Sequence, residues 1–112
     1  MAELMRVNED ACSQPIVVRA EPDLADLVPQ YLERRRAELP ALHAALLVAD
    51  VGALQKAGHR LKGSAAGYGC AALGALGAEL DAAARAGDLN AAERAVAAIS
   101  NWLSRAVPAP AS

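Results

Sequence analysis

The stretch HRLKGS, residues 59–64, combines side chains that suit the transfer of a phosphoryl group. An exposed imidazole such as that of His59 is largely neutral at pH 7, so one ring nitrogen is free to act as a nucleophile. Lys62, one helical turn later, supplies a cation that can meet the oxygens of a phosphoryl group on that nitrogen. Gly63 leaves space beside the histidine, which permits another protein's backbone to approach. Since glycine in a helix interior costs about 1 kcal/mol relative to alanine, its place here requires such a reason.

The helix around this stretch is predicted to hold His59 on its outward face. At about 100° per residue, Leu54, Ala57 and Leu61 lie roughly opposite His59 and point into the core. The residues within about 60° of the histidine are Gln55, Lys56, Lys62, Gly63 and Ala66. Ser64 lies toward the flank, at about 140°. A hydrogen bond from its hydroxyl to a backbone carbonyl is as well supported there as a role in transfer.

The composition indicates one helical domain. The chain has 112 residues, of which 54% are hydrophobic and 3% aromatic, and it has no phenylalanine. Abundant alanine and leucine favour closely packed helices over a sheet. The formal net charge is −2, and most basic residues are dispersed, so we expect no nucleic-acid partner. The run Arg34–Arg36 stands among acidic residues and is interpreted as a solvated helix face.

Neither the cysteines nor the histidines have the spacing of a metal site. Cys12 and Cys70 lie far apart, and His43 and His59 are not paired as zinc ligands are. The first ten residues do not have the pattern of a signal peptide, and no apolar stretch approaches the length of about 18 residues that spans a bilayer. We therefore expect no membrane association, a cytoplasmic location and reduced thiols, with Cys70 acting as a small buried hydrophobe.

The apolar period and the helix breakers predict four sizeable helices. We expect an extended arm over residues 1–21, with Pro22 opening a short helix, and a flexible tail over residues 107–112. The predicted helices span about 30–47, about 51–66, about 71–86 and about 90–106. Pro40 is expected to bend the first of them or to cost it a hydrogen bond locally. Asp50 is expected to cap the second of these helices, and Asp88 or Asn90 the fourth.

These elements predict an all-α fold. We expect an antiparallel up-down four-helix bundle over residues 22–106, with a short extra N-terminal helix and an extended N-terminal arm. Trp102 is expected to cover one end of the core, where its indole N–H reaches water. A monomer is expected, because one histidine per bundle suffices and no apolar stripe is left for a partner helix.

The stretch HRLKGSAAGYG resembles the His-x-x-Lys-Gly-Ser signature of histidine-containing phosphotransfer (HPt) domains. The resemblance extends over roughly residues 22–106 and includes LVPQYLERRR before the motif and LGALGAEL after it. It implies that His59 accepts a phosphoryl group from a receiver-domain aspartate and passes it to another receiver. Lys62 would then stabilise the phosphoryl group, and Gly63 would provide clearance for the receiver.

The resemblance also implies the partners and the surface that binds them. The partners would be response-regulator receiver domains and a hybrid histidine kinase, with Mg²⁺ held by the receiver and no cofactor in this chain. The residues expected to bind the partner are Gln55, Lys56, Arg60, Ser64 and Ala66. No nucleotide site is visible in the sequence, so we expect a phosphocarrier and not an enzyme with its own ATP site.

Two positions on the next helix differ from the family pattern. Some HPt domains carry a polar amide there that supports the histidine, whereas this chain offers Asp81 and Arg85. Asp81 is suited to orient the imidazole, but its charge would repel the phosphorylated form. Arg85 is suited to hold phosphate, although a simple surface pair with Asp81 at helical spacing is the favoured interpretation.

Other readings remain open from the sequence alone. The bundle could dock a receiver or a histidine kinase and inhibit it without carrying phosphate, or form one domain of a larger kinase. His59 could also be an incidental surface histidine, a reading made less favourable by its neighbours. His43 has no such neighbours and is interpreted as structural or solvated.

Overall fold

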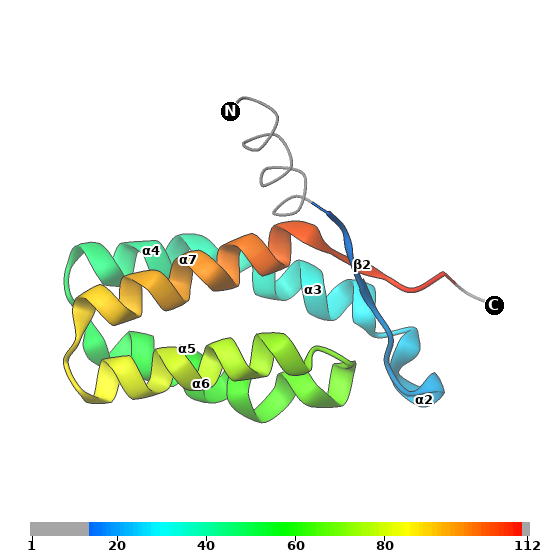
Figure 1. The fold of residues 1–112 in the computed structure, drawn as a ribbon, viewed down its shortest axis with the longest axis horizontal. Coiled ribbons are helices and arrows are strands. Elements are labelled where there is room, and N and C mark those ends of the chain that lie inside the picture. The colour runs from blue at the N-terminus through cyan, green and yellow to red at the C-terminus, as the bar shows by residue number, and fades with distance from the viewer. Residues whose placement is uncertain (1–13, 111–112) are drawn as a thin grey trace, which may run out of the picture.

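The computed structural model describes residues 14–110, and these residues are mostly helical. Its elements in chain order are β1 (Ile16–Val18), α2 (Pro22–Ala25), α3 (Val28–Ala37), α4 (Leu39–Leu47), α5 (Val51–Ser64), the 3₁₀ helix η1 (Ala65–Tyr68), α6 (Ala71–Arg85), α7 (Leu89–Arg105) and β2 (Ala106–Pro108). In Figure 1 the chain reverses direction at the loops after α4 and α6 and at η1, so that α3 to α7 lie along one long axis. The predicted all-α class is thus confirmed by the predominance of helix.

The ends of the helices follow from local side-chain chemistry. Asp50 accepts a hydrogen bond from the Ala53 backbone N–H at 3.1 Å, and Asp88 accepts one from the Ala91 N–H at 3.0 Å. Both aspartates therefore satisfy a backbone donor that the first turn leaves free. The cap predicted at Asp50 is confirmed, and of the two residues considered for α7 the cap is Asp88, because Asn90 lies inside the helix.

The first long helix is broken where the sequence predicted a bend. We expected one helix from Gln30 to about residue 47, but α3 ends at Ala37 and α4 begins at Leu39, with Glu38 between them. Pro40 lies in the first turn of α4. Proline has no N–H to donate, and the first turn is where that loss is harmless. The proline therefore starts a helix here and does not bend one.

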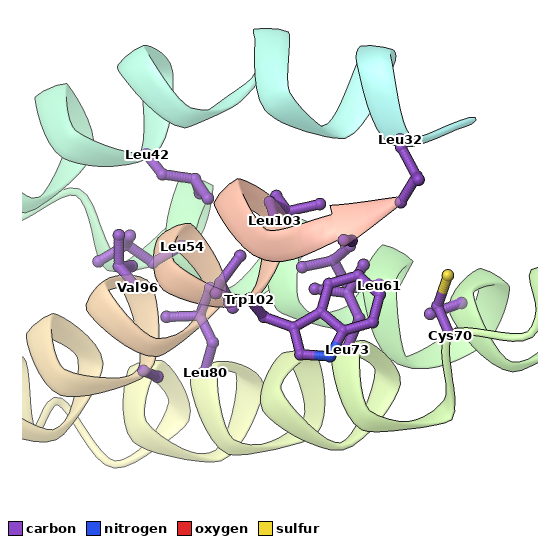
Figure 2. Close-up of a cluster of buried hydrophobic side chains, with 14 of the residues drawn as sticks. Leu32, Leu42, Leu54, Leu61, Cys70, Leu73, Leu80, Val96, Trp102 and Leu103 are labelled. Atoms are coloured by element: carbon purple, nitrogen blue, oxygen red, sulfur yellow. The ribbon is translucent and has the colours of Figure 1, made fainter. Parts of the chain in front are cut away.

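The core consists of leucines and small residues from all the longer helices. Leu32, Leu54, Leu73 and Leu80 have no exposed surface, and Figure 2 shows such side chains from α3, α5 and α6 meeting around α7. Trp102 belongs to this cluster and is only 8% exposed. That it covers one end of the core stays a prediction. In a chain without phenylalanine, Trp102 and Tyr31 supply the aromatic rings of this cluster.

Short strands join the two ends of the described chain. β1 and β2 pair in parallel, with Ile16 opposite Ala106 and Val18 opposite Pro108. The Ala109 N–H adds a hydrogen bond to the Val18 carbonyl at 2.9 Å. The segment around β1 is extended, as expected of the arm, but it pairs with the chain that follows α7. The prediction of a flexible tail from residue 107 is wrong for Val107 to Ala109, because their backbone is paired.

The arginine run is not simply a solvated face. Arg36 donates hydrogen bonds to the carbonyls of Leu103 at 2.9 Å and Ala106 at 2.6 Å, so its charge lies at the C-terminal end of α7. That end of a helix carries partial negative charge and free carbonyls. Arg35 lies over the Tyr31 ring at 4.9 Å and pairs with Glu38 at 2.9 Å. Arg34 and Arg36 are exposed as that interpretation expects, although Arg36 also binds two backbone carbonyls, whereas Arg35 is half-buried and departs from it.

Candidate functional site

The helix α5 carries the HRLKGS stretch and turns His59 outward. Its buried residues are Leu54, Gly58 and Leu61, whereas His59 and Lys62 are exposed. The division agrees with the helical geometry predicted from the sequence. The imidazole is therefore presented to solvent on a helix whose opposite side is anchored in the core.

Two glycines bring α5 unusually close to α6. A Cβ atom added at Gly58 would lie 2.6 Å from both the Gly77 carbonyl oxygen and the Asp81 backbone nitrogen. A Cβ atom added at Gly77 would lie 2.5 Å from the Leu61 Cβ and 2.9 Å from the Lys62 backbone nitrogen. The backbones thus meet where side chains are missing. Sequence reasoning missed this crossing, although the matching glycines in two consecutive helices were a signal for it.

His59 lies in an open hollow whose other polar residues are mostly cationic. The hollow has a volume of about 500 Å³ and is lined by Ala53, Gln55, Lys56, His59, Arg60 and Arg85. It therefore brings together His59, three predicted partner-binding residues and Arg85 of the next helix. The three cationic side chains around His59 favour an arriving anionic group.

The remaining residues of the predicted surface lie beside this hollow on the same helix or just after it. Lys62, Gly63 and Ala66 are exposed, and they do not line the hollow itself. A Cβ added at Gly63 would meet no heavy atom of the described residues within 4 Å. The space next to His59 is therefore open. This contrasts with Gly58, where the space is filled by the backbone of α6.

Ser64 makes a side-chain contact that the sequence did not predict. Its Oγ lies 2.8 Å from the Tyr31 hydroxyl oxygen, a hydrogen bond in which either group can donate. We had considered a backbone carbonyl or the transfer reaction as its partner. The Tyr31 ring in turn stacks on Tyr68, with centroids 4.2 Å apart and planes at 15°. Ser64 thus ties the end of α5 to α3.

Asp81 and Arg85 form the expected pair, but it is not a surface pair. The Arg85 Nε donates to the Asp81 Oδ1 at 2.9 Å, one helical turn away. The side chain of Asp81 is only 8% exposed, whereas that of Arg85 is 60% exposed. Asp81 therefore binds the Arg85 guanidinium from its buried side, and Arg85 lines the hollow that contains His59. The favoured interpretation was right about the pairing and wrong about the burial of Asp81.

Other candidate groups take no part in this arrangement. Cys70 is fully buried, and burial raises the pKa of its thiol to about 11, so it is protonated near neutral pH. It packs as the expected small hydrophobe, while Cys12 lies outside the described residues. His43 is exposed on α4, away from the hollow.

Two further features concern residues 14–110 alone. Within that range, acidic, cysteine and histidine side chains do not gather in groups of three or more that would suit a metal ion. In the same part of the chain, each helix is too short or too polar to cross a membrane.

Comparison with known proteins places this geometry in a family. A family model for the Hpt domain matches residues 26–108, about three quarters of the chain. Neither the curated proteins nor the solved structures contain a significant match to the chain. Hpt domains are phosphocarrier modules that work with receiver domains and histidine kinases in two-component phosphorelays. Because the family model covers most of its length, this chain belongs to the Hpt domain family and takes part in histidine phosphotransfer.

Proposed function

We propose that this protein is a phosphocarrier in which His59 accepts a phosphoryl group from the aspartyl phosphate of one receiver and passes it to another. The observation that carries the proposal is the exposed imidazole of His59 in a hollow with three cationic side chains. Such a site attracts a phosphoryl group and leaves room for the protein that brings it.

In the proposed step, a ring nitrogen of His59 attacks phosphorus in line with the aspartyl oxygen. The nitrogen–phosphorus bond forms as the phosphorus–oxygen bond breaks, and the carboxylate leaves with the electron pair. The second ring nitrogen keeps its proton. Phosphoryl transfer of this kind depends on positioning and on stabilising charge. Transfer to the second receiver is the same step in reverse.

We assign roles to the surrounding residues from their positions relative to His59. Lys62 would offset charge on the phosphoryl oxygens, and Gly63 would let the receiver approach. Gln55, Lys56, Arg60, Ser64 and Ala66 would form the receiver-binding surface, although the hydrogen bond of Ser64 to Tyr31 supports a structural part for Ser64. Arg85 would add a further cation to the hollow, held by Asp81. Asp81 would then act on Arg85 and not on the imidazole.

Several further points belong to the same proposal. The chain would need no cofactor of its own, because Mg²⁺ would be held by the receiver, and it would have no kinase activity. It would act as a monomer in the cytoplasm, without binding nucleic acid or membrane. The alternation of chain direction visible in Figure 1 supports an antiparallel four-helix bundle in which α3 and α4 together form the first member.

The test is phosphotransfer from phosphorylated receiver domains to the wild-type protein and to His59→Gln. We expect label on the wild type that is labile in acid and stable in base, and none on His59→Gln. His43→Gln is the matched control, because it removes the other histidine, also exposed, and should be labelled fully. Absence of label on the wild type, with binding of the receiver retained by both proteins, would instead indicate a docking module that carries no phosphate.

A further inference from the structure

Large apolar side chains are exposed at one end of the molecule. Of the seven exposed large hydrophobic residues within residues 14–110, four belong to the loops that follow α4 and α6 or to the helix ends beside them. They are Leu47 (88% exposed), Val48 (73%), Val51 (39%) and Leu89 (38%), which we call the apolar end. Figure 1 shows both loops at the left end of the molecule.

The exposure is not a consequence of an incomplete core. The helix α4 already buries Leu42 and Ala45, and Leu46 packs partly against the core. Leu47 and Val48 therefore come after the inward-facing positions of the helix have been used, at sites where polar residues would leave the core unchanged. Several large apolar residues exposed together are typical of a surface that another molecule covers.

The apolar end lies within reach of a protein docked at His59. Val51 precedes His59 by eight residues of α5, which corresponds to about 12 Å along the helix axis. A protein interface of ordinary size covers about 800 Å² of each partner, roughly a disc of 16 Å radius. One partner centred on His59 therefore extends over the beginning of α5 and the neighbouring loop.

The charges of the hollow at His59 favour a receiver over a second copy of this chain. Lys56, Arg60 and Arg85 line the hollow that contains His59, whereas the apolar end itself carries the exposed helix caps Asp50 and Asp88. Two copies that met around His59 would bring the three cations of each hollow toward each other, which is unfavourable. A receiver instead presents an acidic phosphorylation site, and an apolar surface next to that site would complement both parts of this face.

We propose that the apolar end is a second contact for the receiver, which contributes affinity and partner choice but takes no part in the chemistry. The inference rests on the proposed function, since it names the partner of the same face. Contacts with the cations weaken as salt is added, whereas burial of Leu47 and Val48 does not depend on charge. The two contributions can therefore be separated by ionic strength.

The experiment uses a double variant, Leu47→Thr with Val48→Thr, in the full chain. Both side chains are largely exposed, so the fold should be retained, as circular dichroism and thermal unfolding would verify. The dissociation constant is measured by calorimetry with a receiver that phosphorylates wild-type His59. We expect it to rise at least tenfold, with the same factor at low and high salt. The transfer rate at saturating receiver should be unchanged.

The matched control is Val17→Thr with Val107→Thr. These valines are 48% and 41% exposed and oppose each other in the β1–β2 pair. The control should bind the receiver as the wild type does. Equal affinities for wild type and the Leu47/Val48 variant would overturn the inference while transfer to His59 continued. A wild-type dimer in sedimentation that the variant abolished would overturn it in favour of a second copy. If no receiver labels the wild type, the proposed function fails, and the inference fails with it.

Discussion

Gly58 and Gly63 lie five residues apart in α5, yet they meet opposite environments. At Gly58 an added Cβ would press on the backbone of α6 at 2.6 Å, whereas at Gly63 it would meet nothing within 4 Å among the described residues. The first glycine lets two helices approach, and the second leaves a surface open. The same residue type in the same helix therefore meets packed backbone on one side and open space on the other.

This difference extends to the two faces of α5. The buried face, with Gly58 and Leu61, determines how closely α5 lies to α6 and hence where Arg85 stands relative to His59. The exposed face carries the imidazole and Lys62 without contributing to the core. Substitutions on the first face should change stability, and substitutions on the second should change transfer.

The largest effect is expected from Gly58→Ala, which should lower the free energy of unfolding. The new methyl group would collide with backbone atoms, which cannot rotate away, so we expect a loss of about 1–3 kcal/mol in the free energy of unfolding. Urea denaturation measures it. The control is Gly52→Ala, because a Cβ at Gly52 would lie 3.6 Å from the Asp50 Oδ1, an ordinary contact. A Gly58→Ala protein as stable as the wild type would show that α5 and α6 can separate without cost.

Lys62→Ala is expected to have a smaller effect, and this effect is on the rate of phosphotransfer and not on stability. Loss of the cation should slow transfer from a phosphorylated receiver by about ten- to a hundredfold, while stability stays within about 0.5 kcal/mol of the wild type. Rapid-quench measurement of labelled His59 gives the rate. Lys56→Ala is the informative partner, because Lys56 lines the hollow and Lys62 does not. If Lys56→Ala were the slower variant, the hollow and not the motif position would hold the phosphoryl group.

The smallest effect on stability is expected from Gly63→Ala, which should raise the free energy of unfolding by about 0.5–1 kcal/mol because alanine is the better helix former. The longer side chain of Gly63→Gln should leave the fold intact but weaken receiver binding several-fold, measured by calorimetry. Destabilisation by Gly63→Ala would remove the contrast with Gly58. Unchanged receiver binding by Gly63→Gln would remove the role of Gly63 in access.

Much of the local structure followed from the sequence because its causes are local. Asp50 is followed by a helix whose free N–H groups it satisfies, and the spacing of leucines placed His59 opposite Leu61 before any packing was known. The break between α3 and α4 was misjudged, because proline is compatible with the first turn of a helix as well as with a bend. Which of these occurs depends on whether the preceding residues continue the helix.

Contacts between distant segments were not predictable in the same way. Tyr31 and Ser64 are 33 residues apart, and Arg36 reaches carbonyls of Leu103 and Ala106, 67 and 70 residues later. The spacing of residues along the chain does not predict such pairs. The pairing of β1 with β2 was missed for this reason, since each strand has only three residues and reads as an irregular end.

By itself, the sequence determined the helical class, the outward direction of His59 and the resemblance of HRLKGS to a phosphotransfer motif. These depend on periodicity and on residue types within a few turns of one helix. Only the tertiary structure decided that Gly58 meets Gly77, that Arg85 is held by a buried Asp81 beside His59, and that Leu47 and Val48 remain uncovered. Each of these depends on the distance between separate helices. That distance is set by the packing of the whole core and not by any single segment.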